Sequence, residues 1–161
     1  MTKLKNLGVY HLIAVIGLFA TAAVQADDMD DATALLNAYI ETESDLNAQS
    51  KLMSEDRIFI VGSPAMRITD NATNMMGQAH GEKRRKAMDP ESLYFATIED
   101  PIVRMYGDVA VASFRRNLNF RPSADGMRNG MSNNTGRQLV TVVMAKVDGD
   151  WKIVHTHISS A

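Results

Sequence analysis

The stretch Asp148-Gly149-Asp150-Trp151-Lys152-Ile153-Val154-His155-Thr156-His157-Ile158-Ser159 decides the fold. Asp148-Gly149 favours a two-residue hairpin turn, and the β-branched residues that follow it favour a strand. Because successive side chains of a strand point to opposite faces, the tryptophan and both histidines are predicted to share one face. That face comprises Trp151, Ile153, His155, His157 and Ser159. This last strand carries the most site-like feature of the sequence.

The residues before this stretch are predicted to complete an antiparallel meander. The pattern indicates strands over residues 93–106, 109–120, 139–147 and 151–159. The first of these is interrupted at Asp100-Pro101, since a proline requires an edge position or a bulge. A loop rich in Gly, Ser and Asn is predicted between residues 122 and 136.

Helices are predicted in the first half of the chain. Asp30 or Asp31 can cap a helix from about residue 32, whose apolar face would include Leu35, Leu36 and Tyr39, with Glu43 on another face. Shorter elements are predicted as a helix over 48–53, strands over 57–61 and 66–68, and one or two helical turns within 82–88. Helices followed by a meander indicate an α+β fold, with the helices packed on one face of a curved sheet.

Residues 1–26 are predicted to be a secretory signal peptide. Two lysines precede an apolar run over residues 12–24, and Val24-Gln25-Ala26 offers the small residues that a signal peptidase reads. The run, about 13 residues, is shorter than the about 20 that a spanning helix needs, so no stable membrane anchor is expected. The mature chain, 27–161, is then one periplasmic or secreted domain.

Composition narrows the class of partner. The formal net charge is −2, and removal of Lys3 and Lys5 with the signal peptide leaves −4, which argues against nucleic acid as a partner. The chain has no cysteine, so disulfides and thiolate chemistry are excluded. No phosphate loop, dinucleotide fingerprint or nucleophile motif is present, so no cofactor is predicted.

A family resemblance rests on these same residues. The stretch from Asp148 to Ser159 closely resembles the closing motif of SnoaL-like members of the nuclear transport factor 2-like superfamily. The association domain of calcium/calmodulin-dependent kinase II ends in a similar way. Tyr39 in the first helix, the Ser54-Glu55-Asp56 segment and the turn from Tyr106 to Ala110 are also similar. The resemblance covers nearly all of residues 30–160.

The resemblance implies a cone-shaped fold, also called cystatin-like, in which a strongly curved sheet wraps around helices and leaves a pocket. It further implies a homodimer formed through the outer face of the sheet. The nearly continuous apolar run over residues 139–145 fits a strand that is buried on both faces.

The expected function is therefore the binding of a small, partly apolar molecule in the cone pocket. Tyr39 and Trp151 would provide aromatic walls, and the polar contacts would come from Arg116, Arg137, His155 and His157. Alternation along the 109–120 strand places Arg116 in an apolar row, where a guanidinium is costly unless it is paired.

Three other interpretations stay open. The first is an enzyme of the polyketide cyclase, dehydratase or isomerase kind, with His155, His157 or Asp100 transferring protons. Ketosteroid isomerase chemistry itself is disfavoured, because Gly62-Ser63-Pro64-Ala65 lacks the carboxylate expected there. A zinc site formed by His80 with the two strand histidines is the second. The third is a pure assembly module, which predicts a cone filled by side chains.

Overall fold

The computed structural model describes residues 27–62 and 65–160. The chain runs from a first helix over residues 27–41 through η1 (Thr42–Ser44), α2 (Leu46–Lys51), β1 (Met53–Gly62), β2 (Ala65–Ile68), α3 (Asn71–Met88), β3 (Leu93–Tyr106), β4 (Val109–Arg121), α4 (Ala124–Arg128), β5 (Asn134–Val147) and β6 (Asp150–Ser160). The predicted signal peptide, 1–26, and Ser63-Pro64 lie outside the described residues.

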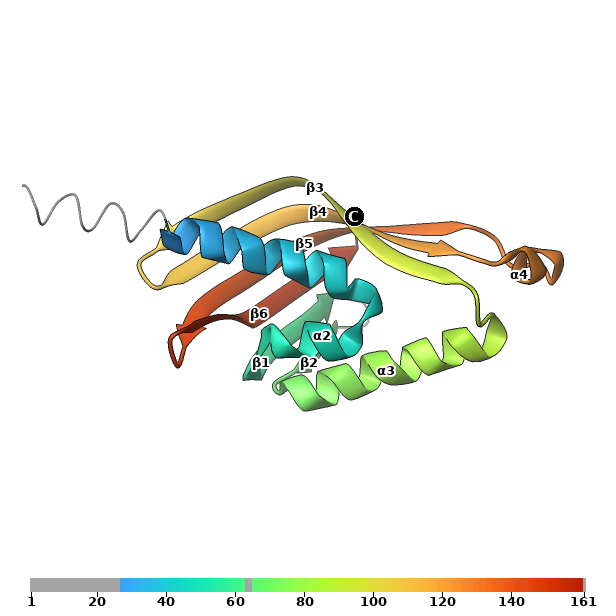
Figure 1. Cartoon of the computed structure of the whole chain (residues 1–161), viewed down its shortest axis with the longest axis horizontal. Coiled ribbons are helices and arrows are strands. Elements are labelled where there is room, and N and C mark those ends of the chain that lie inside the picture. Colours follow the sequence, from blue (N-terminus) through green and yellow to red (C-terminus); the bar gives the residue numbers. More distant parts are fainter. Residues whose placement is uncertain (1–26, 63–64, 161) are drawn as a thin grey trace, which may run out of the picture.

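The strands form one open, curved sheet in the order β2-β1-β6-β5-β4-β3. All neighbouring pairs are antiparallel except β1 and β6, which are parallel. The first helix, α2 and α3 lie on the same side of the sheet (Figure 1). We call that side the inner face and the opposite side the outer face. The predicted α+β fold, with helices on one face of a curved sheet, is confirmed.

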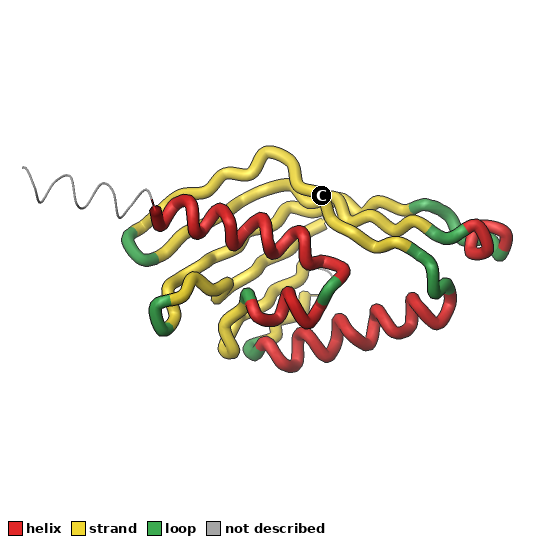
Figure 2. Tube along the Cα trace, in the orientation of Figure 1, coloured by secondary structure: helices red, strands yellow, loops and turns green. Residues whose placement is uncertain are grey.

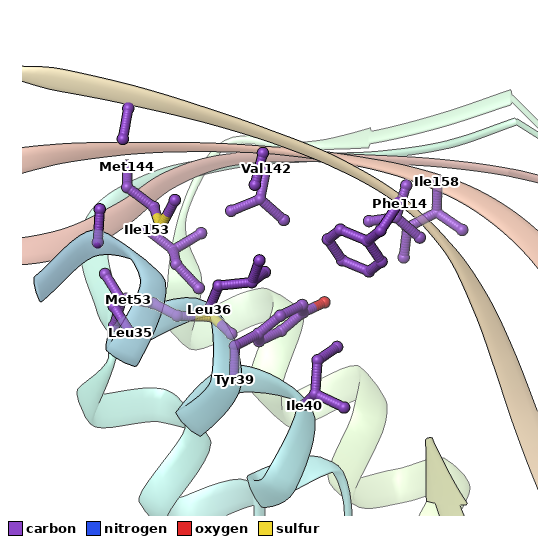
Figure 3. Close-up of a cluster of buried hydrophobic side chains, with 14 of the residues drawn as sticks. Leu35, Leu36, Tyr39, Ile40, Met53, Phe114, Val142, Met144, Ile153 and Ile158 are labelled. Carbon is purple, nitrogen blue, oxygen red and sulfur yellow. The ribbon is translucent and has the colours of Figure 1, made fainter. Parts of the chain in front are cut away.

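The core lies between the first helix and the inner face. Leu36 and Tyr39 of the helix point toward Phe114 of β4 and Val142 of β5, all of them buried (Figure 3). Leu36 and Tyr39 are three residues apart, and residues three or four apart lie on one face of a helix. The predicted apolar face of the first helix is therefore confirmed.

The last strand contains a β-bulge that the sequence did not reveal. Val143 of β5 pairs with His155, but the next residue, Met144, pairs with Ile153, so Val154 is left unpaired. An extra residue reverses the alternation of side chains beyond it. Ile153 points inward, and beyond the bulge Thr156 and Ile158 are the buried residues. The prediction that both histidines share a face with Trp151 and Ile153 is therefore wrong.

Two elements, α3 and β5, begin earlier in the chain than predicted. Helix α3 begins at Asn71, eleven residues before the predicted turns, and Asp70 caps it by accepting a hydrogen bond from Thr73 N at 2.7 Å. The predicted 122–136 loop contains the short helix α4 and the first residues of β5. The β4–β5 hairpin, with α4 at its tip, and the start of β3, which pairs with β4 as far as Arg121, extend beyond the other strands (Figure 2).

Candidate functional site

Two adjoining cavities open between the helices and the inner face. The deep cavity, about 180 Å³, and the rim cavity, about 250 Å³, share Glu43, Gln78 and Tyr94. The deep cavity is also lined by Tyr39, Phe59, Val61, Arg116, Leu118, Gln138 and Ile158. The rim cavity adds Leu46, Gly81, Glu82 and Arg85. The cone is therefore not filled by side chains, contrary to what a pure assembly module predicts.

Arg116 is the central polar side chain of the deep cavity. It lies on β4 and is only 4% exposed. Its Nη1 donates to Glu43 Oε2 at 3.3 Å and to Tyr39 Oη at 3.4 Å, and its Nε donates to Gln138 Oε1 at 2.9 Å. The requirement that a buried guanidinium be paired is thus met by three elements: the first helix, η1 and β5.

Glu43 lies where η1 follows the first helix, and it is 9% exposed. Besides Arg116, it accepts a hydrogen bond from Gln49 Nε2 at 3.3 Å. Burial raises the pKa of Glu43, and this effect outweighs the opposing attraction of Arg116. The cavity therefore contains a carboxyl group that holds its proton more tightly than an exposed glutamate does.

A second buried arginine, Arg57 of β1, lies behind the cavity wall. It is 1% exposed, and its guanidinium lies 5.0 Å from the ring centroid of Phe59, which lines the deep cavity. It contacts Met53 Sδ, and with the Asn74 amide oriented to satisfy both groups, Asn74 accepts from its two terminal nitrogens at 3.3 Å. Its Nε has no hydrogen-bond partner among the described residues.

The rim cavity contains a basic and an acidic side chain that pair with each other. Arg85 of α3 lies over the ring of Tyr94, with its guanidinium carbon 4.0 Å from the ring centroid, and pairs with Glu82 at 3.9 Å. Burial raises the pKa of Tyr94, so its hydroxyl stays neutral over the physiological range. The rim thus offers an aromatic surface and a neutral hydrogen-bonding group.

Of the predicted ligand-binding residues, the structure brings two together at this site. Tyr39 and Arg116 both line the deep cavity. Arg137 is exposed on the outer face of β5, next to the inward-facing Gln138. Trp151 packs near the start of the first helix, where its Nε1 donates to Asp28 at 3.4 Å and Lys146 lies 5.6 Å from its ring centroid. Neither Arg137 nor Trp151 lines the two cavities.

The predicted proton-transfer residues lie on the outer face. The β6 bulge turns His155 and His157 away from the helices. Asp100, with φ of 51°, occupies the break in β3 and pairs with the exposed Arg115. Three strand spacings separate β3 from β6, a distance of roughly 14 Å. Asp100 and the histidines therefore share a face but do not converge.

The three histidines of the predicted zinc site do not come together. Across residues 27–62 and 65–160, no three His, Cys, Asp or Glu side chains gather closely enough to hold a metal ion. His80 lies on α3, on the other side of the sheet from His155 and His157. In the same part of the chain, no helix is long and apolar enough to cross a membrane.

A wider groove of about 1000 Å³ lies beside α2 and the β5–β6 turn. Its charged side chains include Lys51, Glu55, Asp56, Asp148 and Asp150, all of which are exposed. Water and salt screen such charges. The smaller cavities on the inner face are the stronger candidate site because two of their charged groups, Glu43 and Arg116, are buried and hydrogen-bonded to each other.

Sequence reasoning missed several residues of the site, of which Glu43 is the most important. It lies four residues after Tyr39, and residues four apart share a helical face. That spacing was the available signal, and the prediction that Glu43 lies on another face is wrong. Gln138 could not be identified from helical spacing, because it lies beside Arg116 only through the pairing of β4 with β5.

Comparison with known proteins supports this architecture. A protein of Novosphingobium aromaticivorans described as nuclear transport factor 2-like with a cystatin-like fold is 18% identical, with a TM-score of 0.65 over 88% of this chain and 87% of that one. A candidate dehydratase of the same superfamily from Streptomyces avermitilis is 15% identical, with a TM-score of 0.63 over 85% of this chain and 98% of that one.

A candidate calcium/calmodulin-dependent kinase II association domain from Exiguobacterium sibiricum is 18% identical, with a TM-score of 0.57 over 81% of this chain and 91% of that one. At these identities the similarity shows the fold alone. No curated protein matches this sequence. The profile of the SnoaL-like domain matches residues 32–161, nearly the whole described chain. The chain therefore belongs to the SnoaL-like domain family.

Proposed function

We propose that this chain is an exported binding domain for a small, partly apolar molecule, held in the deep and rim cavities. The observation that carries the proposal is the composition of the cavity walls. Tyr39, Phe59 and Tyr94 supply aromatic surface, while the buried Arg116 and the half-buried Gln138 supply polar groups. An apolar cavity with a few convergent polar groups is the usual form of a small-molecule site.

Ligand-observed NMR with two neutral probes, phenol and benzamide, tests this proposal. Leu118 lines the deep cavity, so Leu118→Trp should fill it and abolish binding of both probes. The matched control is Leu93→Trp, because Leu93 is exposed at the start of β3. Absence of binding, or binding that Leu118→Trp leaves unchanged, would contradict the proposal.

The alternative of acid–base catalysis by His155, His157 or Asp100 gains no support from their positions. All three lie across the sheet from the cavities, and Asp100 is three strands away from the histidines. A general acid or base must come within hydrogen-bond reach of the proton that it transfers. Binding is therefore the better supported function.

The proposal includes a homodimer formed through the outer face. Large apolar side chains are exposed there, namely Ile58, Phe95, Ile102, Tyr106 and Leu139. An exposed apolar surface of this kind is typical of an interface. Size-exclusion chromatography with light scattering should give twice the subunit mass, and the double variant Ile102→Asp, Leu139→Asp should give the monomer mass. A monomeric wild type would refute the dimer.

Export is proposed from the sequence of residues 1–26. Intact mass measurement of the protein recovered from the periplasm or medium should show cleavage after Ala26. Recovery of the full-length chain from the cytoplasm alone would contradict export.

A further inference from the structure

The charges around the deep cavity do not balance. Arg57 and Arg116 are both buried, yet Glu43 is the one carboxylate in the described part of the chain that forms an ion pair with either of them. A buried guanidinium without a counter-charge is unfavourable. Arg57, Arg116 and Glu43 together therefore carry an excess positive charge when Glu43 is ionised, and a larger excess when Glu43 is protonated.

Resting on the proposed function of this cavity, we propose that its ligand is an organic carboxylate that binds Arg116, and that Glu43 takes up a proton when the ligand binds. The ligand then replaces Glu43 as the negatively charged partner of Arg116. Glu43 and the ligand compete for one guanidinium, so binding of the carboxylate is linked to protonation.

The contacts of Arg116 indicate where the carboxylate would bind. Its Nη1 and Nε already donate to Glu43, Tyr39 and Gln138. Among the described residues, no group accepts a hydrogen bond from its Nη2. Guanidinium groups bind carboxylates through two parallel hydrogen bonds. A carboxylate in the deep cavity would therefore use Nη2 and share Nη1 with Glu43.

The surroundings of Glu43 explain why it, and not the ligand, takes up the proton. Burial already raises the pKa of Glu43 in the absence of ligand. The groups that face it are Arg116 of β4, Arg57 of β1, Arg85 and Glu82 of α3, Tyr39 of the first helix, Tyr94 of β3 and Gln49 of α2. A second carboxylate nearby would raise the pKa of Glu43 further, because like charges disfavour ionisation.

The remaining walls favour an organic acid over an inorganic anion. Phe59, Val61, Leu118 and Ile158 give the deep cavity an apolar side, and a monoanion matches the single negative charge that Glu43 gives up when it takes up a proton. Apolar walls favour the hydrocarbon part of a ligand. Benzoate and its neutral isostere benzamide are suitable probes, since they differ mainly in the carboxylate.

Isothermal titration calorimetry with benzoate and benzamide tests the inference on the full mature chain. Benzoate should bind at least about tenfold more tightly than benzamide, because only benzoate offers the charge. Between about pH 8 and pH 6, where a carboxyl group with pKa near 4 stays ionised, its affinity should rise as pH falls. The limit is about tenfold per pH unit for one proton taken up.

Variants separate the two parts of the inference. Glu43→Gln should bind benzoate with an affinity that no longer depends on pH. The matched control is Glu41→Gln, which removes the same charge from an exposed position two residues away and should keep the pH dependence. Titrations of the wild type in buffers of different ionisation enthalpy measure proton uptake directly, so the test does not depend on Glu43→Gln folding.

Each outcome has one meaning. Equal binding of benzoate and benzamide, both lost in Leu118→Trp, overturns the carboxylate inference and leaves the proposed function standing. Tight benzoate binding without proton uptake overturns the role of Glu43. If neither benzoate, benzamide nor phenol binds, the proposed function fails, and the inference fails with it.

Discussion

Arg115 and Arg116 are neighbours in β4, yet they lie on opposite faces of the sheet in opposite surroundings. Arg115 is exposed on the outer face, where it pairs with the exposed Glu99 and Asp100. Arg116 is buried on the inner face, where it pairs with the buried Glu43. Two adjacent residues of the same type thus meet two different dielectric environments.

The comparison teaches that burial, rather than residue type, identifies the site in this fold. Exposed ion pairs contribute about 0–1 kcal/mol because water screens them. Removal of one partner from a buried pair costs about 3–5 kcal/mol, because it leaves an uncompensated charge. The histidines and Asp100 are residue types that often transfer protons in enzymes, but here they lie on the outer face. Glu43, Tyr39 and Arg116 form a hydrogen-bonded cluster on the inner face.

The largest difference between the faces should come from two phenylalanines. Phe114 is 3% exposed on the inner face, and Phe95 is 39% exposed on the outer face. Phe114→Ala should lower the free energy of unfolding by about 3–5 kcal/mol, and Phe95→Ala by less than about 1 kcal/mol in the isolated subunit. Urea denaturation at low protein concentration measures both, and equal losses would contradict the assignment of faces.

The neighbouring arginines should differ almost as much. Arg116→Met leaves Glu43 buried without its partner, so it should cost up to about 3–5 kcal/mol at neutral pH and less in acid, where Glu43 is protonated. Arg115→Met should cost no more than about 1 kcal/mol. Thermal unfolding at two pH values tests this pair. A larger effect of Arg115→Met would refute the comparison.

A smaller effect is expected in how the contribution of Glu43 to stability depends on pH. Since burial raises the pKa of Glu43 above its ordinary value of 4.5, the folded chain binds the proton more readily than the unfolded chain does. The contribution of Glu43 to the free energy of unfolding should therefore fall as pH rises from 4.5 through the raised pKa. Urea titrations of wild type and Glu43→Gln, with Glu41→Gln as control, isolate this contribution. A rise in the same range would contradict it.

The smallest expected effect has the opposite sign and belongs to the outer face. Burial lowers the pKa of His155 below 6.5, with a further contribution from His157. The unfolded chain then binds the proton more readily, so the contribution of His155 to stability should fall as pH drops below 6.5. The difference between wild type and His155→Asn across this range measures it. A contribution of His155 that instead grows as pH drops below 6.5 would contradict burial as the cause of the lowered pKa.

The strands of this fold could be predicted from the sequence because their signals are local. Asp148-Gly149 and Gly107-Asp108 mark the two tight turns, and alternation assigned the faces of β4 correctly. Helix α3 was mostly missed, since it has no continuous apolar stripe: its buried residues are Asn71 and Asn74. A helix that packs through polar residues gives a weak periodic signal.

The site was only partly predictable for a related reason. Tyr39 and Arg116 were identified because periodicity within one element placed each on the core side. The bulge at Val154 reversed the predicted positions of His155 and His157, and bulges depend on pairing with neighbouring strands. No pattern within β6 alone could reveal it.

The most direct test of the central claim, that ligands bind at the inner face, is an NMR titration of the wild-type chain with benzoate. We predict that ring signals of Tyr39 and Tyr94 and the side-chain signals of Arg116 shift saturably, because all three line the deep cavity. Ring signals of His155 and His157 should stay in place. Saturable shifts of the two histidines with no change at Tyr39, Tyr94 and Arg116 would contradict binding at the inner face.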